Sequence, residues 1–152
     1  MKLIDILDAT RIPVAYRISF LTNFWREPLL RKMERETGLI RPELTVLICL
    51  SFRDNLYARD ICEITEQPSN TVSRAVTSLV KNGYITRTRD TVDTRRQVLN
   101  ITRSGRGVHD ALMAKFSKAE AKMLKCLTKE ERSTLTALLD KLARDVNRWR
   151  CE

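Results

Sequence analysis

Apolar side chains recur at helical spacing over most of this chain. Between residues 12 and 37 they follow one another at intervals of three and four, with Pro13 near the start and Gly38 just past the end. This pattern predicts one long helix with a kink at Pro28, because proline removes a backbone hydrogen bond inside a helix. The apolar positions of this helix are Ala15, Ile18, Leu21, Trp25 and Leu29.

A short apolar helix is predicted next, with Pro42 in its first turn and an end near residues 54–55. Its length and composition are typical of a helix in a protein core. The positions expected to be buried are Leu44, Leu47, Ile48 and Cys49.

Two further short helices are predicted after an extended link at Leu56. The first covers residues 58–65 and ends at Gln67-Pro68, and the second is capped by Ser69 and continues to Asn82. Two short helices that meet at a tight turn form a helix-turn-helix. The apolar stripe of the second helix is Val72, Ala75, Val76, Leu79 and Val80.

A β-hairpin is predicted directly after this motif. Gly83 ends the helix, residues 84–89 are rich in strand-forming side chains, and residues 97–101 form the return strand. The intervening loop DTVDTRR is longer than most hairpin loops, a property typical of functional loops. The hairpin is therefore expected to form a wing with arginine at its tip.

The rest of the chain is predicted to be helical. A helix over residues 102–127 would bury Val108, Leu112, Phe116, Ala119 and Met123. Thr128 and Glu131 then form a capping box for a last helix. The apolar stripe of this helix is Leu135, Leu138, Leu139, Leu142, Val146 and Trp149. So close to the C-terminus, the stripe would be exposed in a monomer and covered in a homodimer.

Positive charge gathers on the second helix of the motif and on the hairpin. Residues 69–106 hold eight Lys or Arg against two acids, in a chain with a net charge of +9. Charge concentrated in this way indicates a polyanionic partner, and double-stranded DNA is the natural candidate. The outward positions are short hydrogen-bonding side chains and two cations: Ser69, Asn70, Thr71, Ser73, Arg74, Thr77, Ser78 and Lys81.

This outward face suits the major groove, where small side chains can approach base edges and arginine can grip guanine with two donors. The alternative is an ordinary solvated face, which usually carries Glu and Lys pairs at four-residue spacing. No acid occurs between Ser69 and Arg89, which favours the DNA-binding interpretation. On the first strand, Arg87 and Arg89 are expected to contact phosphates.

Other functional classes find little support in the sequence. No apolar run approaches the roughly 20 residues that span a bilayer, and acids stand where a signal peptide would be apolar, so a soluble cytoplasmic protein is expected. A Gly-rich phosphate loop and a Ser-His-Asp arrangement are both missing, so we expect neither an enzyme nor a cofactor.

Four cysteines are scattered along the chain without a CxxC pair, and His109 is the only histidine. This set does not predict a zinc site. The simplest interpretation is that the thiols are small buried hydrophobes plus one free terminal thiol, while a redox-sensing cysteine stays open as an alternative. The cysteines are Cys49, Cys62, Cys126 and Cys151.

The segment LVKNGYITRTRDTVDTRRQVLNITRSG, residues 79–105, resembles the MarR (multiple antibiotic resistance regulator) family of winged helix-turn-helix repressors. In that family the wing reads D-P-x-D-R-R and is followed by L-T-x-x-G. The matching residues here are Asp90, Asp93, Arg95, Thr102 and Gly105. Thr91 replaces the usual proline, Thr94 the first arginine and Ile101 the leucine.

The resemblance implies roles for the wing. Arg95 would enter a minor groove, whose narrow shape concentrates negative potential, and Asp93 would orient its guanidinium. Because Thr94 replaces an arginine, Arg96 is the alternative second contact. A surface ion pair of little energetic consequence is the other interpretation of Asp93 and Arg95.

The resemblance also implies a fold that is mainly α with a small β-hairpin wing, a winged helix-turn-helix with N- and C-terminal dimerisation helices. Residues 1–40 would form the first dimerisation helix, 41–102 the DNA-binding lobe and 103–152 the last dimerisation helices, all in one intertwined domain. The homodimer would bind a pseudo-palindromic operator with recognition helices about 10 base pairs apart.

A small aromatic carboxylate or phenolic effector would bind between the lobes and release a repressor from DNA. The candidate contacts are Tyr16, Arg17, Phe20, Trp25 and His109, for which core and dimer packing is the competing interpretation. The alternatives in function are a redox-responsive repressor and a winged-helix protein that contacts protein or RNA.

Overall fold

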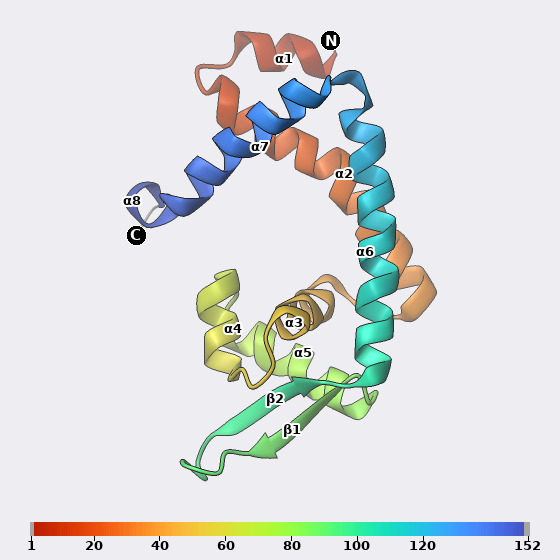
Figure 1. The fold of residues 1–152 in the computed structure, drawn as a ribbon, viewed down its shortest axis with the longest axis vertical. Coiled ribbons are helices and arrows are strands. Elements are labelled where there is room, and N and C mark those ends of the chain that lie inside the picture. Colours follow the sequence, from red (N-terminus) through yellow and green to blue (C-terminus); the bar gives the residue numbers. More distant parts are fainter. Residues whose placement is uncertain (1, 151–152) are drawn as a thin grey trace. The chain divides into compact units, whose positions relative to one another are not determined.

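The computed structural model describes residues 2–150 and is drawn in Figure 1. Contacts divide the chain after Phe116 into two compact units, which are described separately below. The strands are β1 (Ile85–Arg89) and β2 (Gln97–Ile101), and the helices are α1 (Leu3–Ala9), α2 (Pro13–Thr37), α3 (Arg41–Phe52), α4 (Ala58–Thr65), α5 (Ser69–Lys81), α6 (Arg103–Met123), α7 (Lys129–Arg144) and α8 (Val146–Trp149). The prediction of a mainly α fold with a small hairpin is confirmed.

The core of the first unit lies where α3, α4 and α5 pack together above the hairpin. From α3 it takes Leu44, Val46, Leu47 and Leu50, and Ile61 comes from α4. The predicted stripe of α5 is buried at Val72, Ala75, Val76 and Leu79, with Val80 partly covered. Ile85, Leu99 and Leu112 close the core from the strands and from α6. The apolar face of α5 therefore packs into the core, and its polar face stays outside the core.

Helix α2 has the predicted length and continues through Pro28. Its buried side chains are Leu30 and Met33, near its end. The predicted apolar positions of the first half stay open to solvent, with exposures of 43% for Ile18 and 54% for Leu21. A single chain therefore leaves much of this helix's apolar surface uncovered.

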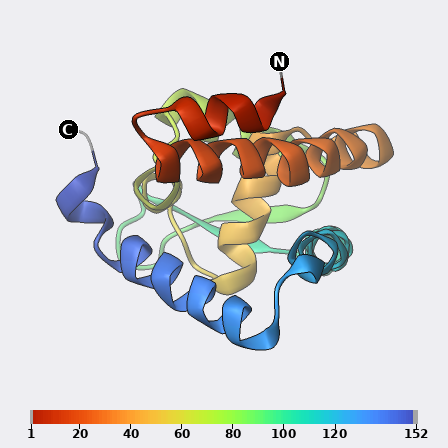
Figure 2. The same ribbon diagram turned by 90° about the horizontal axis from the view of Figure 1, so that it is seen from above.

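Helix α1 was not predicted from the sequence. It lies alongside the first half of α2 in both views (Figures 1 and 2). Arg17 joins the two helices, since its guanidinium donates to the Leu7 carbonyl oxygen at 2.8 Å and forms an ion pair with Asp8 at 2.6 Å. The N-terminal turn is closed by Asp5, which accepts the Lys2 amide at 2.6 Å.

The start of α5 differs from the prediction by one residue. Pro68, not Ser69, is the N-cap, and the Ser69 side chain makes no capping bond. The Pro68 carbonyl oxygen accepts the amides of Thr71 and Val72 at 3.0 and 3.1 Å. Proline suits this position because an N-cap needs a carbonyl acceptor but no amide donor. The predicted stop is confirmed, since Gly83 adopts a φ of 74°.

The predicted hairpin forms, and its strands pair antiparallel with Ile85 opposite Ile101 and Arg89 opposite Gln97. Its base is tied to the link between α3 and α4, where the Leu99 amide donates to the Leu56 carbonyl oxygen at 2.8 Å. The predicted extended link at Leu56 thus forms an isolated bridge with β2. Figure 1 shows the hairpin projecting beyond α5 within this unit.

The second unit contains the end of α6, a short 3-10 turn, α7 and α8. The predicted capping box is confirmed, with Thr128 Oγ1 accepting the Glu131 amide at 3.2 Å and Glu131 accepting the Thr128 amide at 2.8 Å. The predicted single last helix instead breaks at Asp145. Across the break the Trp149 indole donates to the Leu142 carbonyl oxygen at 2.9 Å.

Candidate nucleic-acid interface

The outer face of α5 carries the predicted polar residues. Arg74 and Lys81 are exposed, and within the described residues neither forms an ion pair. Thr77 bonds the Ser73 carbonyl oxygen at 2.9 Å, which turns that hydroxyl toward its own helix. Exposed with them are Ser69, Asn70 and Ser73, whereas Thr71 and Ser78 are half-buried. The two cations are therefore free to meet an external anion.

Strand β1 extends the basic surface. Ile85, Arg87 and Arg89 alternate along one face of the hairpin, opposite Ile101, Leu99 and Gln97. Ile85 and Leu99 at the base of this face are buried in the core, whereas both arginines are exposed. This face of the hairpin thus packs against the helices at the base of the wing and carries positive charge toward the tip.

The loop between the strands is a compact hydrogen-bonded turn. Asp90 Oδ1 accepts the amides of Val92 and Asp93 at 2.6 and 3.2 Å, and Asp93 Oδ1 accepts the Arg95 amide at 3.1 Å. The Asp90 amide donates to the Arg96 carbonyl oxygen at 3.0 Å, which closes the turn. The side chains of Asp90 and Asp93 therefore fix the backbone conformation of the tip.

The expected pairing of Asp93 with the Arg95 guanidinium is wrong. Asp93 forms its ion pair with Arg96, with Nε and Oδ2 3.1 Å apart. One oxygen of Asp93 accepts the Arg95 backbone amide, and the turn places the Arg96 side chain, three positions along, next to the other oxygen. Among the described residues, the Arg95 guanidinium has no ion-pair partner. Of the two arginines in the loop, Arg95 is consequently the one that is free to bind a ligand.

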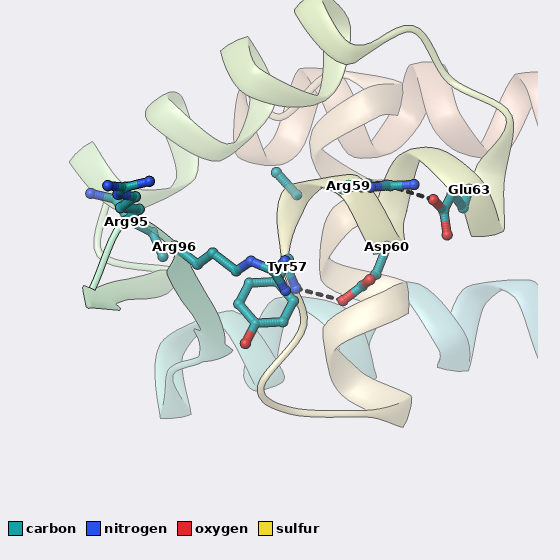
Figure 3. Close-up of a pocket in the computed structure, with 8 residues that line it drawn as sticks. Tyr57, Arg59, Asp60, Glu63, Arg95 and Arg96 are labelled. Carbon is teal, nitrogen blue, oxygen red and sulfur yellow. Dashed lines mark hydrogen bonds and ion pairs between the residues drawn. The ribbon is translucent and has the colours of Figure 1, made fainter. Parts of the chain in front are cut away.

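A hollow of about 610 Å³ separates the wing from the start of α4. Figure 3 shows Tyr57 at its centre with the Arg96 side chain running over the ring, while Arg95 lies apart from it. The hollow is lined by Tyr57, Ala58, Arg59, Asp60, Glu63, Arg95, Arg96 and Gln97.

The sequence reasoning missed Tyr57. Its hydroxyl donates to Asp90, and the Arg96 guanidinium lies 5.6 Å from the ring centroid. This hydrogen bond lowers the pKa of the Asp90 carboxyl and raises the pKa of the Tyr57 hydroxyl. No local sequence signal reveals the contact, because 33 residues separate the two partners.

Of the five predicted effector contacts, two pack against each other and the other three have different neighbours. Tyr16 stacks edge-on with Phe20 at 5.9 Å, and Trp25 with Phe116 at 5.4 Å. His109 lies 6.4 Å from the Phe52 ring. The remaining predicted contact, Arg17, is engaged by the end of α1.

The thiols differ in their surroundings. Cys49 and Cys62 are half-buried and Cys126 is exposed, while Cys151 lies outside the described residues. Burial raises the pKa of the Cys49 thiol and so disfavours its reactive thiolate. Within residues 2–150 no cluster of three metal-ligating side chains forms, and no helix combines the length and apolar character needed to cross a bilayer.

Comparisons with known proteins agree with this geometry. The MarR family model matches residues 37–96, which cover α3, α4, α5, β1 and the wing loop. The HTH-type transcriptional regulator YwaE of Bacillus subtilis is 28% identical over 136 residues, which is 86% of this chain and 80% of YwaE. A crystal structure of a MarR-family transcriptional regulator from Silicibacter pomeroyi superposes with a TM-score of 0.74 at 25% identity, covering 100% of this chain and 99% of that one. Over residues 37–96 the chain is thus similar to the MarR family.

The chain shares its fold with a further solved structure. A MarR-family transcriptional regulator from Listeria monocytogenes, complexed with 26mer DNA, has a TM-score of 0.77 at 20% identity and covers 87% of each chain. In this chain the winged helix-turn-helix is thus built from α4, α5 and the hairpin.

Proposed function

We propose that this MarR-family regulator is a sequence-specific DNA-binding repressor that acts in the cytoplasm. The observation that carries the proposal is the acid-free outer face of α5, whose cations form no ion pair within residues 2–150, beside a wing loop whose Arg95 is likewise unpaired there. In this proposal α5 enters the major groove and Arg74 reads a base edge with two donors. Arg87 and Arg89 meet phosphates, and Arg95 enters the minor groove.

The repressor would bind as a homodimer. Supporting this, α7 and α8 expose an apolar stripe, and α2 exposes a second one. A two-fold dimer presents two copies of α5 to successive major grooves, so its operator is a pseudo-palindrome with half-sites about 10 base pairs apart. Such a complex on a promoter blocks access by polymerase, which makes the regulator a repressor.

Fluorescence anisotropy with the promoter DNA beside its own gene tests the proposal. The wild-type protein should bind this DNA more tightly than a scrambled duplex. Arg95→Ala should weaken binding to both and reduce the salt slope by about one unit. Arg74→Ala should also relax base preference, at a cost of about 1–3 kcal/mol for a bidentate contact. Arg35→Ala, an exposed charge on α2, is the matched control.

Equal affinity for promoter and scrambled DNA contradicts sequence-specific recognition. Unchanged affinity in both Arg74→Ala and Arg95→Ala contradicts the assigned interface. Transcription from the bound promoter in vitro decides between repression and activation.

For the proposed effector, there is a second candidate site besides the five predicted residues. A cavity of about 340 Å³ is lined by Arg26, Leu30, Arg41, Leu44, Thr45, Ile48, Thr65, Gln67 and Phe116. The Arg26 Nε and Gln67 Oε1 atoms are buried there without a hydrogen-bond partner among the described residues. Beside apolar walls, the Arg26 Nε–H suits the carboxylate of a small aromatic ligand, and Gln67 Oε1 suits a phenolic hydroxyl, which can donate to it.

Thermal-shift screening with aromatic carboxylates tests this site. A ligand that binds the native state should raise the melting temperature and weaken DNA binding. Arg26→Met should abolish the shift, whereas Arg31→Met, an exposed position on the same helix, should retain it. A flat screen, combined with loss of DNA binding in peroxide, would favour the redox alternative. Cys126 is then the exposed thiol to replace first.

A further inference from the structure

Tyr57 joins the tip of the wing to the body of the first unit. In the described part of the chain, residues 90–96 make a hydrogen bond and a ring contact with residues outside the hairpin, and both contacts involve Tyr57. The hydroxyl reaches Asp90 at the start of the loop, and the ring faces Arg96 at its end. One side chain therefore contacts both ends of the loop.

The base of the hairpin has separate supports. The Asn55 amide donates to the Asn100 side chain at 2.9 Å, and the Ile101 amide donates to Asp54 at 3.3 Å. These bonds hold the inner half of β2 but do not reach the loop. Hollows of about 610, 520 and 280 Å³ all adjoin Tyr57, so little else packs beneath the tip.

Tyr57 is itself firmly placed. It is the N-cap residue of α4, and its amide donates to Asp60 at 2.8 Å. A tyrosine side chain offers no capping bond at such a position, where Ser, Thr, Asp or Asn is preferred. Helix capping therefore does not explain why this residue is a tyrosine, whereas the contact with the wing does.

A chain of hydrogen bonds leads from Tyr57 to Arg95. The hydroxyl binds one oxygen of Asp90, and the other oxygen accepts the Val92 and Asp93 amides. Asp93 in turn accepts the Arg95 amide at 3.1 Å. The ring meanwhile occupies Arg96, which leaves Arg95 as the free guanidinium.

We propose that Tyr57 is a positioning residue that fixes the wing tip and thereby presents Arg95 to DNA. The second half of this proposal rests on the proposed function, because it needs a DNA ligand. The first half concerns the free protein and is tested without DNA. Tyr57 acts through the loop and touches no nucleotide.

The first experiment measures amide hydrogen exchange of the wing in the full-length protein. Tyr57→Phe removes the hydroxyl and keeps the ring, so the Val92, Asp93 and Arg95 amides should exchange roughly two- to tenfold faster, as expected for one lost hydrogen bond. Tyr84→Phe is the control, because that hydroxyl makes no hydrogen bond within the described residues. Equal exchange in Tyr57→Phe and wild type overturns the proposal.

The second experiment is a double-mutant cycle on promoter affinity. Tyr57→Phe should weaken binding roughly two- to tenfold, and the loss caused by Arg95→Ala should be smaller in the Tyr57→Phe background than in wild type. A tyrosine with a merely structural role would give additive losses, and additivity overturns the link to Arg95. If the wild type binds no DNA, the proposed function fails, while hydrogen exchange still decides whether Tyr57 fixes the tip.

Discussion

At the scale of single residues, the start of α6 shows why the family pattern ends in T-x-x-G. The Thr102 hydroxyl lies 2.8 Å from the Gly83 carbonyl oxygen and 3.0 Å from that of Tyr84, and it accepts the Gly105 amide at 3.1 Å. A Cβ on Gly105 would lie 2.0 Å from the Tyr84 carbonyl oxygen. Glycine is required here because the helix approaches the backbone at the start of the hairpin so closely.

Gly105→Ala should therefore destabilise the protein, because the neighbouring atom belongs to backbone and cannot move aside cheaply. Overpacking of this kind costs about 3 kcal/mol, which should lower the melting temperature by roughly 6–12 °C. Gly107→Ala is the matched control in the same helix, where an added Cβ meets nothing within 4 Å. It should stabilise by about 0.5–1 kcal/mol, since glycine is a poor helix former. Equal melting temperatures for the two variants would contradict this account.

The Tyr57–Asp90 pair should make the wing sensitive to extremes of pH only. The Tyr57 hydroxyl lowers the pKa of Asp90. The stability that the Asp90 carboxylate adds to the folded wing is therefore present above the ordinary carboxyl pKa and is lost as pH falls through the lowered value. Asp90 raises the pKa of Tyr57, so that contribution is present below about pH 10 and lost as pH rises through the raised value. An NMR titration should show the Asp90 pKa rising toward its ordinary value in Tyr57→Phe. An Asp90 pKa that stays low in this variant would contradict the contact.

At the scale of elements, the sequence pattern predicted the features that depend on residues close together in the chain. The bounds of α4 and β2, the Gly83 stop and the capping box at Thr128 all depend on residues close in sequence, and all are confirmed. The Tyr57 contact and the Gly105 approach depend on residues brought together only by folding. Helix α1 was missed because its seven residues are too few for periodicity to reveal.

The ion pair of the wing was predicted with the wrong partner for a similar reason. Sequence spacing places Asp93 near both Arg95 and Arg96, and turn geometry decides between them. The predicted effector contacts were harder to place. Tyr16 packs with Phe20, Trp25 with Phe116 and His109 with Phe52. Phe116 also borders the cavity that holds the Arg26 and Gln67 atoms left unpaired within the described residues, and no sequence spacing indicates that these residues meet.

The confirmed capping box gives a prediction for α7. Thr128→Ala removes the acceptor of the Glu131 amide and should destabilise the helix by about 1 kcal/mol. Thr128→Ser keeps the oxygen and should stay close to wild type. Thermal unfolding followed by circular dichroism measures both variants, and equal losses in the two would show that the cap contributes nothing.

At the scale of the whole molecule, the exposed apolar residues support the proposed homodimer. In α7, Leu138, Leu139 and Leu142 have exposures of 57%, 43% and 45%. In α2, Val14 and Leu21 have exposures of 64% and 54%. Isolated apolar side chains on a surface are ordinary, but stripes on whole helices mark an interface. A second copy of the chain offers the same stripes and explains both.

Leu138→Glu should therefore convert the protein from dimer to monomer. In a two-fold interface the change occurs twice, so it removes two apolar contacts of about 1.5–3 kcal/mol each and buries two charges at once. Sedimentation velocity at micromolar concentration should show a dimer for the wild type and a monomer for the variant, with a dimer dissociation constant at least about a hundredfold weaker. Promoter affinity should fall with it, because one α5 then binds one half-site.

Ala137→Glu is the matched control for this change. It adds the same charge to the opposite face of α7, where the side chain is exposed and outside the apolar stripe, and it should leave the dimer intact. A wild-type protein that sediments as a monomer would contradict the dimer, and so would a Leu138→Glu variant that stays dimeric. If Leu138→Glu is monomeric and still binds a full operator as tightly as wild type, then recognition does not need two copies of α5, and the pseudo-palindromic operator must be abandoned.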